Sequence, residues 1–332
     1  MTTKRIMFKL GLAVVLFGCT GTTPTQAPAT ATAPPVVTTA PATQLPPTEE
    51  PCREVTHAAG DSCVPANPQR VVTLGCQTSL EYALALGLPI VGHDVAPWPP
   101  EIPPYVDASR LAGSKSVGSC FEPDLELVKP LNPDLIIYTF DAGNYAQVSA
   151  IAPTVVLPVG YLSYRDDFLT AAELLGRTDE ANAHLAALDS RIAALKAKLA
   201  LKFAGKTVAV FGTGTDGRAT IETTGTYVGE LMTDLGLERP AAQVAEERLR
   251  ISLEQIGLLD ADVAFATFGY TDPSTAEAGA ETKAQYTENA LWQTLKFVQD
   301  NQLIEMDKSV WSLHGIFWAD GVLQDLEAKA LP

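Results

Sequence analysis

The sequence predicts an α/β protein of two lobes that a single long helix joins. Apolar runs of β type alternate with helical segments in the first half of the chain, and the alternation resumes in the second half. Between them, residues 177–202 carry apolar side chains at three- and four-residue spacing, which predicts a helix about 37 Å long. A chain of 332 residues, 46% of them hydrophobic, is long enough to form two such lobes.

The first lobe is expected over residues 52–163. Its alternating elements favour a parallel sheet with helices on both faces. Strands are expected at 69–75, 88–94, 133–140 and 153–159, and helices at 79–87, 124–132 and 144–152.

A helical section is expected over residues 164–203, and the second lobe over 204–332. The section holds helices at 164–176 and 177–202. The second lobe is expected to have strands at 207–212, 261–269 and 303–307, a hairpin through 218–223, and helices at 227–236, 253–259, 290–300 and from about 314. Both lobes are thus Rossmann-like. Because open α/β sheets bind ligands outside the carboxyl ends of their strands, the cleft between the lobes is the expected site.

Residues 1–18 have the features of a signal peptide. Basic residues near the start accompany an apolar stretch, residues 10–17, that is too short to cross a membrane. The "LFGC" that ends this segment resembles the bacterial lipoprotein box, in which the cysteine, here Cys19, becomes lipidated after cleavage. An ordinary secretory signal is the alternative. Residues 19–51 are rich in Pro, Thr and Ala and are expected to form an extended tether.

The net charge of the chain is −16, and it becomes −19 once the three basic residues of the signal segment are removed. Such acidity argues against nucleic acid and anionic membrane surfaces as partners of the folded part. It also means that an anionic ligand needs locally concentrated Arg or Lys.

Four cysteines follow Cys19, an even number that favours disulfides in an exported protein, with three possible connectivities. The segment "CREVTHAAGDSC" is typical of two short strands around a turn, which brings Cys52 and Cys63 together. Cys76 and Cys120 then remain as the second pair. A metal site is the alternative, but the spacings lack C-x-x-C and no histidine lies close in sequence.

Three other patterns were weighed as functional signals. Gly212, Gly214 and Gly217 have the G-x-G-x-x-G spacing of dinucleotide-binding turns, but a strand rather than a helix is expected next. The four histidines are scattered. Ser79 and Ser252 lack the surroundings of catalytic nucleophiles and are expected to be helix N-caps.

A family resemblance rests on the order and spacing of several segments. "VPANPQRVVTLG", "SLEYALALGLPIVG", "VGSCFEPDLELVKPLNPDLII" and "ENALWQTLKFVQDNQLIEMD" resemble the extracytoplasmic substrate-binding proteins of iron-siderophore ABC importers, the relatives of ferric-citrate, ferrichrome and cobalamin binders. The resemblance runs from about Val64 to Leu326. The terminal "SLHGIFWADGVLQDLEAKAL" is most similar to the ferric-citrate type.

The resemblance implies a monomeric clamp without enzymatic activity or cofactor, lipid-anchored to the outer face of the cytoplasmic membrane in the cell envelope. It implies that the clamp captures a ferric siderophore, ferric citrate or a similar chelate, and delivers it to a dimeric ABC permease. Heme or cobalamin is the alternative ligand. An exported hydrolase and a surface adhesin are more distant alternatives.

Two phrases of the sequence repeat, "LELVKPLNPDLIIY" from Leu125 and "LEQIGLLDADVAF" from Leu253. In the resembled family a surface glutamate on each lobe meets permease arginines, and Glu126 and Glu254 stand at the matching positions. The alternative is that both only complement the dipoles of their helix N-termini.

A ferric chelate already fills the coordination sphere of its iron, so aromatic surface and positive charge are the expected contacts rather than metal ligands. In the resembled family, hydroxamate binders have a cleft arginine where this chain has Cys120, which puts hydroxamate coordination in doubt. The candidate ligand contacts are Trp98, Arg110, Phe121, Phe140, Tyr161, Arg165, Arg218, Tyr227, Arg250, Phe268, Tyr270, Trp311 and His314.

Overall fold

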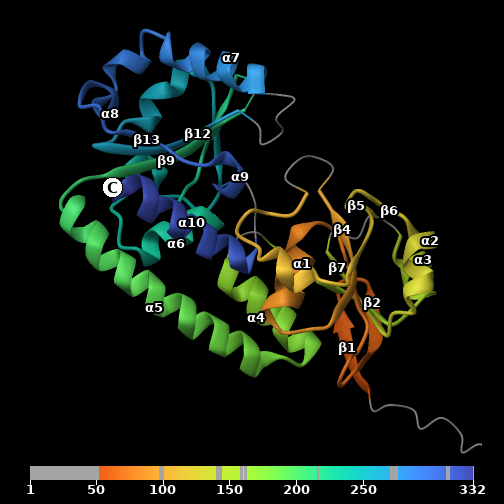
Figure 1. The fold of residues 1–332 in the computed structure, drawn as a ribbon. Coiled ribbons are helices and arrows are strands. Elements are labelled where there is room, and N and C mark those ends of the chain that lie inside the picture. The colour runs from red at the N-terminus through yellow and green to blue at the C-terminus, as the bar shows by residue number, and fades with distance from the viewer. Residues whose placement is uncertain are drawn as a thin grey trace, which may run out of the picture. The chain divides into compact units, whose positions relative to one another are not determined.

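The structure is a computed structural model. It describes residues 52–96, 101–139, 144–157, 160, 163–214, 217–269, 276–311 and 315–331, with the backbone alone for 276–279. These residues belong to one compact unit, which begins at Glu49. Two α/β lobes are joined by one long helix, α5 (Thr178–Lys202) (Figure 1). The predicted fold class is therefore confirmed, whereas the expected signal segment and tether lie outside the described residues.

The sheet of the N-terminal lobe has the strand order β6-β5-β4-β3-β7-β8 and is parallel except for β6. Its strands are β3 (Val71–Leu74), β4 (Ile90–Val95), β5 (Lys115–Ser119), β6 (Glu122–Pro123), β7 (Leu135–Thr139) and β8 (Thr154–Leu157). Helices α1 (Gln77–Ala85) and α4 (Tyr164–Leu175) pack on one face, and α2 (Leu125–Val128) and α3 (Tyr145–Ser149) on the other. Successive side chains of β7 point to opposite faces of the sheet. Ile137 therefore belongs to the core on one face and Ile136 to the core on the other.

A two-stranded hairpin precedes this sheet, formed by β1 (Cys52–His57) and β2 (Gly60–Pro65). A disulfide joins Cys52 to Cys63 across it, with 5.4 Å between the Cα atoms. The second disulfide joins Cys76, which precedes α1, to Cys120, which follows β5, with 4.7 Å between the Cα atoms. Both predicted pairings are confirmed.

The sheet of the C-terminal lobe has the strand order β11-β10-β9-β12-β13. Its strands are β9 (Val208–Thr213), β10 (Ala219–Ile221), β11 (Leu249–Ile251), β12 (Val263–Phe268) and β13 (Leu303–Glu305). The strands β9, β12 and β13 are parallel, and β10 pairs antiparallel with β9, as the predicted hairpin requires. Because a strand follows Gly217, the glycine-rich turn lacks the helix N-terminus that a dinucleotide would need.

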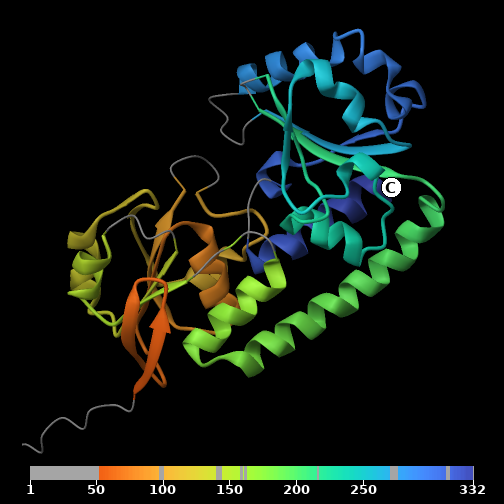
Figure 2. The same cartoon turned by 180° about the vertical axis from the view of Figure 1, so that it is seen from behind.

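Helices cover both faces of this second sheet as well (Figure 2). On the face turned to the long helix lie α6 (Tyr227–Asp234), α9 (Lys308–Trp311) and α10 (Ile316–Ala330). On the other face lie α7 (Ala276–Thr287) and α8 (Lys296–Gln299). Short 3-10 segments are found at Ala108–Leu111, Lys129–Leu131, Ala241–Gln243, Leu253–Leu259 and Trp292–Thr294.

Some element predictions were wrong in detail. The helix expected at 290–300 is a 3-10 turn followed by α8, because Leu295 between them has an extended backbone with ψ of 135°. The segment 253–259 is a 3-10 helix, and α7 was not expected. Ser252 precedes its helix and forms a capping box with Gln255, as predicted. Ser79, in contrast, lies inside α1, where its hydroxyl donates to the Cys76 carbonyl.

The long helix α5 presents one apolar stripe to the protein. Its buried side chains are Ala181, Leu185, Leu188, Ile192, Leu195 and Leu199. Asp179 and Glu180 lie in its first turn and Lys202 in its last, which complements the helix dipole. The stripe belongs to a single core that includes buried residues of both lobes. The two lobes are therefore joined by packing as well as by the chain.

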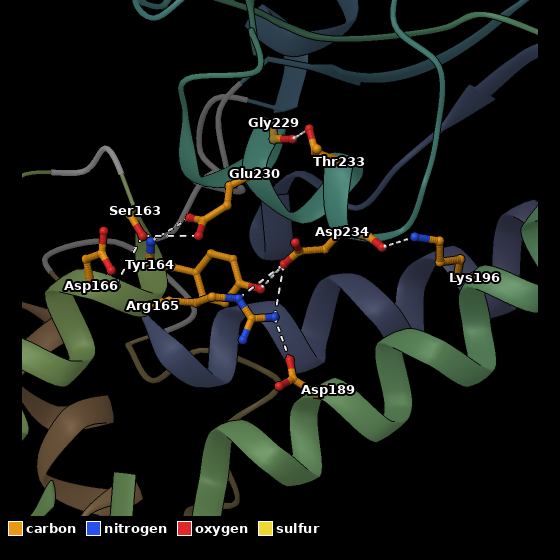
Figure 3. A network of polar contacts seen from close by, with 10 residues as sticks. All are labelled: Ser163, Tyr164, Arg165, Asp166, Asp189, Lys196, Gly229, Glu230, Thr233 and Asp234. Carbon is orange, nitrogen blue, oxygen red and sulfur yellow. Dashed lines mark hydrogen bonds and ion pairs between the residues drawn. The ribbon is translucent and has the colours of Figure 1, made fainter. Parts of the chain in front are cut away.

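A polar network joins α4 to α6 of the other lobe (Figure 3). Glu230 on α6 accepts hydrogen bonds from the Ser163 hydroxyl at 3.1 Å and from the Tyr164 backbone N–H at 2.9 Å. Its carboxylate thus binds the N-terminus of α4, where the first backbone N–H groups lack partners within the helix. In the opposite direction, the Tyr227 hydroxyl on α6 donates a hydrogen bond to the Asp167 carboxylate on α4.

Arg165 lies in the same network and connects three helices. Its guanidinium is 2.7 Å from the Asp189 carboxylate on α5 and 3.0 Å from the Asp234 carboxylate on α6 (Figure 3). The Tyr164 hydroxyl also donates to Asp234, at 2.8 Å. Two carboxylates therefore neutralise this arginine at the junction between the lobes.

Another carboxylate, Glu81, joins the N-terminal lobe to α10. Glu81 on α1 is fully buried, and it accepts from the Trp318 backbone N–H at 3.0 Å and from the Tyr105 hydroxyl at 2.9 Å. A Cβ on Gly315 would lie 2.1 Å from the Glu81 carboxylate, and a Cβ on Gly321 would lie 2.7 Å from the Tyr105 ring. The glycine that precedes α10 and the one within it therefore permit the close approach of the N-terminal lobe.

None of the helices in the described part of the chain combines the length and the apolar composition that a membrane crossing needs.

The Glu81 carboxylate should make stability depend on pH. Burial raises the pKa of Glu81 to about 7, against the opposing effect of hydrogen bonds from Tyr105 and the α10 backbone. The folded protein thus binds a proton more readily than the unfolded chain, so stability falls as pH rises from 4.5 to 7, by roughly 3 kcal/mol. Glu81→Gln cannot ionise and should lose this part of the pH dependence, measured by urea unfolding at pH 5 and 7.5.

A second variant, Asp94→Asn, applies the same test to another buried carboxyl group. Burial raises the pKa of Asp94 to about 7 as well, so each variant should flatten the curve separately and the double variant should flatten it further. A Glu81→Gln protein with the full pH dependence of the wild type would contradict the assignment.

Candidate ligand-binding site

A pocket of about 210 Å³ lies in the C-terminal lobe, where the parallel strands β9 and β12 end. Strands β10 and β11 form one side of the pocket, and α9 closes another. In Figure 1, α9 lies on the side of this lobe that faces the N-terminal lobe. The position agrees with the expectation that a ligand binds outside the carboxyl ends of the strands.

Among the residues that the structure describes, three basic side chains and one acidic side chain line the pocket. Arg248 is 3.2 Å from the Glu222 carboxylate and is thereby paired with it. Arg250 and Lys308 also line the pocket. The charge of the lining is therefore positive in a chain whose net charge is −16, and the pocket suits an anionic ligand.

Lys308 begins α9 and reaches over the floor of the pocket. Its ammonium is 3.5 Å from the Thr267 hydroxyl and 3.3 Å from the place that a Cβ on Gly212 would occupy. That Cβ would also lie 2.8 Å from the Thr267 hydroxyl, so a side chain at Gly212 would displace both groups. Burial lowers the pKa of Lys308.

Trp311, a predicted contact, also lines the pocket and is 7% exposed. Its indole N–H donates to the Asp325 carboxylate at 2.8 Å, which fixes the ring between α9 and α10. Only a small part of the ring is therefore available to a ligand.

The corresponding strand ends of the N-terminal lobe carry the second disulfide. Gly75 follows β3 with φ of 92°, and a Cβ there would lie 1.8 Å from the Thr139 carbonyl oxygen, so glycine is needed. The Asp94 carboxylate accepts from the backbone N–H groups of Gly75 and Cys76. Phe121, beside Cys120, is 66% exposed. This end of the sheet thus presents an aromatic ring on a covalently fixed turn.

The structure separates the predicted contacts into groups. Arg250 and Trp311 line the pocket. Arg218 and Phe268 flank it: Arg218 accepts a hydrogen bond from Gly214 through its carbonyl, and Phe268 ends β12. Arg110 lies elsewhere, with its guanidinium over the Phe317 ring and bonded to the Leu84 carbonyl.

Two of the predicted contacts lie away from the pocket. Tyr227 is fully buried, and its hydroxyl donates to Asp167. Arg165 points to α5 and α6, where Asp189 and Asp234 neutralise it. Both residues hold the lobes together rather than facing the pocket. Five other candidates lie outside the described residues: Trp98, Phe140, Tyr161, Tyr270 and His314.

Neither Lys308 nor Arg248 is among the ligand contacts predicted from the sequence. The signal for Lys308 was its place just after β13, the last parallel strand. The rule that sites lie at the carboxyl ends of parallel strands applies to β13 as it does to β9 and β12.

Glu126 and Glu254, the predicted docking residues, lie on different lobes and are exposed. The Glu126 side chain is 80% exposed and forms an ion pair with Lys129 at 2.6 Å. Glu254 accepts from the Ser252 hydroxyl, and this hydrogen bond lowers the pKa of Glu254. Each carboxylate lies in the first turn of its helix.

A two-lobed α/β scaffold with a cationic pocket at the strand ends is the architecture of a solute-binding protein. The chain belongs to the periplasmic binding protein family, whose model matches residues 71–310. This confirms the resemblance found in the sequence. The family is made up of substrate-binding proteins, not enzymes, which excludes the exported hydrolase.

Individual relatives support the same assignment. The chain is 34% identical over 298 residues to the probable siderophore-binding lipoprotein YfiY of Bacillus subtilis, covering 84% of this chain and 88% of that protein. It is 30% identical over 268 residues to the Fe(3+) dicitrate-binding periplasmic protein FecB of Escherichia coli, covering 78% and 83%. The crystal structure of Staphylococcus aureus SirA complexed with staphyloferrin B matches with a TM-score of 0.71 and 27% identity, covering 83% of this chain and 97% of that chain.

Proposed function

We propose that this protein captures an anionic ferric siderophore, ferric citrate or a similar carboxylate chelate, and delivers it to the permease of an ABC importer. The observation that carries the proposal is the pocket where β9 and β12 end, which Arg248, Arg250 and Lys308 line together with Glu222, the one acidic side chain among the described lining residues. An iron whose coordination sphere is filled needs no ligand from the protein. Its complex needs compensation for its negative charge, which this pocket supplies.

The names of relatives agree with a carboxylate chelate. FecB and the protein YfmC of Bacillus subtilis are both named for ferric citrate. Other relatives are named for petrobactin, achromobactin and hydroxamates, so family membership alone does not select the chelate. The selection rests on the charges of the pocket.

The location in the cell envelope is part of the proposal. Cys19 is the site of lipidation after removal of residues 1–18, and residues 19–51 tether a monomeric binding unit to the outer face of the cytoplasmic membrane. The relatives YfiY and YhfQ are both named lipoproteins, which supports an anchor of this kind.

The first test is a ligand titration of residues 52–332 followed by tryptophan fluorescence. Ferric citrate should quench at submicromolar concentration, since Trp311 lines the pocket. Arg250→Ala should weaken binding about tenfold or more, and added salt should weaken wild-type binding, because both reduce the attraction of the anion.

The control for this titration is Arg177→Ala, which removes an arginine that pairs with Glu180 at the start of α5 and should leave affinity unchanged. A wild-type protein that responds to no ferric citrate, hydroxamate or catecholate complex would overturn the proposal and turn attention to heme and cobalamin.

Glu126 and Glu254 are proposed to dock the two lobes onto the two permease subunits. They are exposed carboxylates on different lobes, and exposed leucines, Leu127 and Leu258, lie near them in sequence. Reversing both to lysine should abolish uptake of the ferric chelate by cells and leave its affinity for the purified protein intact, because neither residue lines the pocket.

The matched control reverses two other exposed glutamates, Glu54 and Glu288, which changes the net charge equally. Uptake should persist in this control. Persistent uptake in the Glu126→Lys, Glu254→Lys protein would show that the two carboxylates serve only their own helix termini.

A further inference from the structure

The floor of the pocket is a row of residues across four strands. Thr220 on β10 pairs in register with Arg250 on β11 and with Gly212 on β9, and Gly212 pairs with Thr267 on β12. Side chains that are directly opposite in a sheet lie on the same face. Arg250, Thr220, Gly212 and Thr267 therefore form one continuous line, about 14 Å long at the usual spacing of strands.

A neighbouring row of the sheet contains both a positive and a negative side chain. Arg248 and Glu222 stand on the same face, two residues along from Arg250 and Thr220 on the same segments, and they form an ion pair at 3.2 Å. The charge of Arg248 is thereby offset within the protein. No carboxylate belongs to the row of Arg250, Thr220, Gly212 and Thr267.

Lys308 lies over the position in this row that has no side chain. Among the residues that the structure describes, none forms an ion pair with Lys308, and its polar contact is the 3.5 Å approach to the Thr267 hydroxyl. Thr213, at the end of β9, adds a buried hydroxyl without a hydrogen-bond partner to the lining of the same pocket. A half-buried ammonium without a carboxylate partner is costly unless a ligand supplies the negative charge.

We propose that Lys308 is the residue that selects the ligand: its ammonium and the Arg250 guanidinium hold one peripheral carboxylate of the chelate above Gly212 and Thr220. This inference rests on the proposed function and adds a requirement to it. The ligand must carry a carboxylate at its periphery, in addition to the groups that coordinate iron. Neutral hydroxamate chelates lack such a group and leave the ammonium unpaired.

The binding of a carboxylate should be linked to uptake of a proton. Burial lowers the pKa of Lys308; among its neighbours Arg248 lowers it further and Glu222 raises it, while Thr267 and Gly212 add no charge and Arg250 adds a positive one. An anion beside the ammonium favours the charged form and raises the pKa again. Below pH 10.5, as the free protein begins to lose this proton, the complex should therefore hold more protons than the free protein.

The test compares Lys308→Met and Lys308→Arg with the wild type, using the purified protein, ferric citrate and the neutral chelate ferrichrome. Lys308→Met should weaken binding of ferric citrate about 10- to 100-fold, which is typical for loss of one charge-assisted contact. It should not weaken binding of ferrichrome. Lys308→Arg should retain most of the affinity for ferric citrate, because its charge remains.

Calorimetry in buffers of different ionisation enthalpy supplies the second readout. The wild type should take up protons on binding ferric citrate, whereas Lys308→Arg and Lys308→Met should not. Lys296→Met is the matched control: Lys296 pairs with Asp300 at 2.5 Å outside the pocket, and its loss should change neither affinity nor proton uptake. Unchanged melting temperatures would show that the Lys308 variants are folded.

The outcomes separate the two proposals. A wild type that binds neither chelate overturns the proposed function. A wild type that binds ferric citrate, together with a Lys308→Met protein of equal affinity and equal proton uptake, overturns the role of Lys308 and leaves the function standing.

Discussion

Two carboxylates, one fully buried and one half-buried, bind helix N-termini across the boundary between the lobes, and the position of the pocket depends on them. Glu81 of the N-terminal lobe binds the start of α10, and Glu230 of the C-terminal lobe binds the start of α4. Backbone N–H groups at a helix start have no partners within the helix, so each carboxylate satisfies donors that would otherwise be buried unpaired. The two contacts are reciprocal: each lobe supplies one carboxylate, which binds the start of a helix in the other lobe.

The pocket depends on this arrangement because two of its residues lie on α9, close in sequence to α10. α9 carries Lys308 and Trp311, and only four residues separate it from α10. Glu81 fixes the first turn of α10, while Asp325 on α10 accepts from the Trp311 indole. The N-terminal lobe therefore helps to place two pocket residues of the C-terminal lobe, although none of its described residues lines the pocket itself.

The same contacts limit how far the lobes move. The long helix α5 resists bending through its backbone hydrogen bonds, and Arg165 ties it to α4 and α6 through Asp189 and Asp234. A wide hinge motion would break these contacts. A pocket that is largely formed before the ligand arrives loses little affinity to reordering of the protein.

Sequence patterns predicted the architecture because it depends on local signals. The alternation of strands and helices, the periodicity of α5 and the hairpin around Cys52 and Cys63 are all visible within short windows. The pocket was only half predictable. Arg250 and Trp311 were identified by residue type and place, but Lys308 becomes meaningful only once the register of β9, β10 and β12 puts Gly212 beneath it.

Long-range contacts also explain why two of the predicted ligand contacts lie away from the pocket. Tyr227 and Arg165 have the residue types of ligand contacts, yet their partners, Asp167 on α4 and Asp189 and Asp234 on α5 and α6, are 60, 24 and 69 residues away in the sequence. Long-range pairing of this kind leaves no local pattern. A tyrosine or arginine at an element end therefore serves the contact between lobes as readily as it serves a ligand.

The location of bound iron tests the central claim most directly. Crystals of the protein with ferric citrate, measured at the iron absorption edge, should give an anomalous peak above the row of Arg250, Thr220 and Gly212, with a citrate carboxylate between Arg250 and Lys308. An iron peak away from this row, or a complex in which no carboxylate approaches Lys308, would contradict the account.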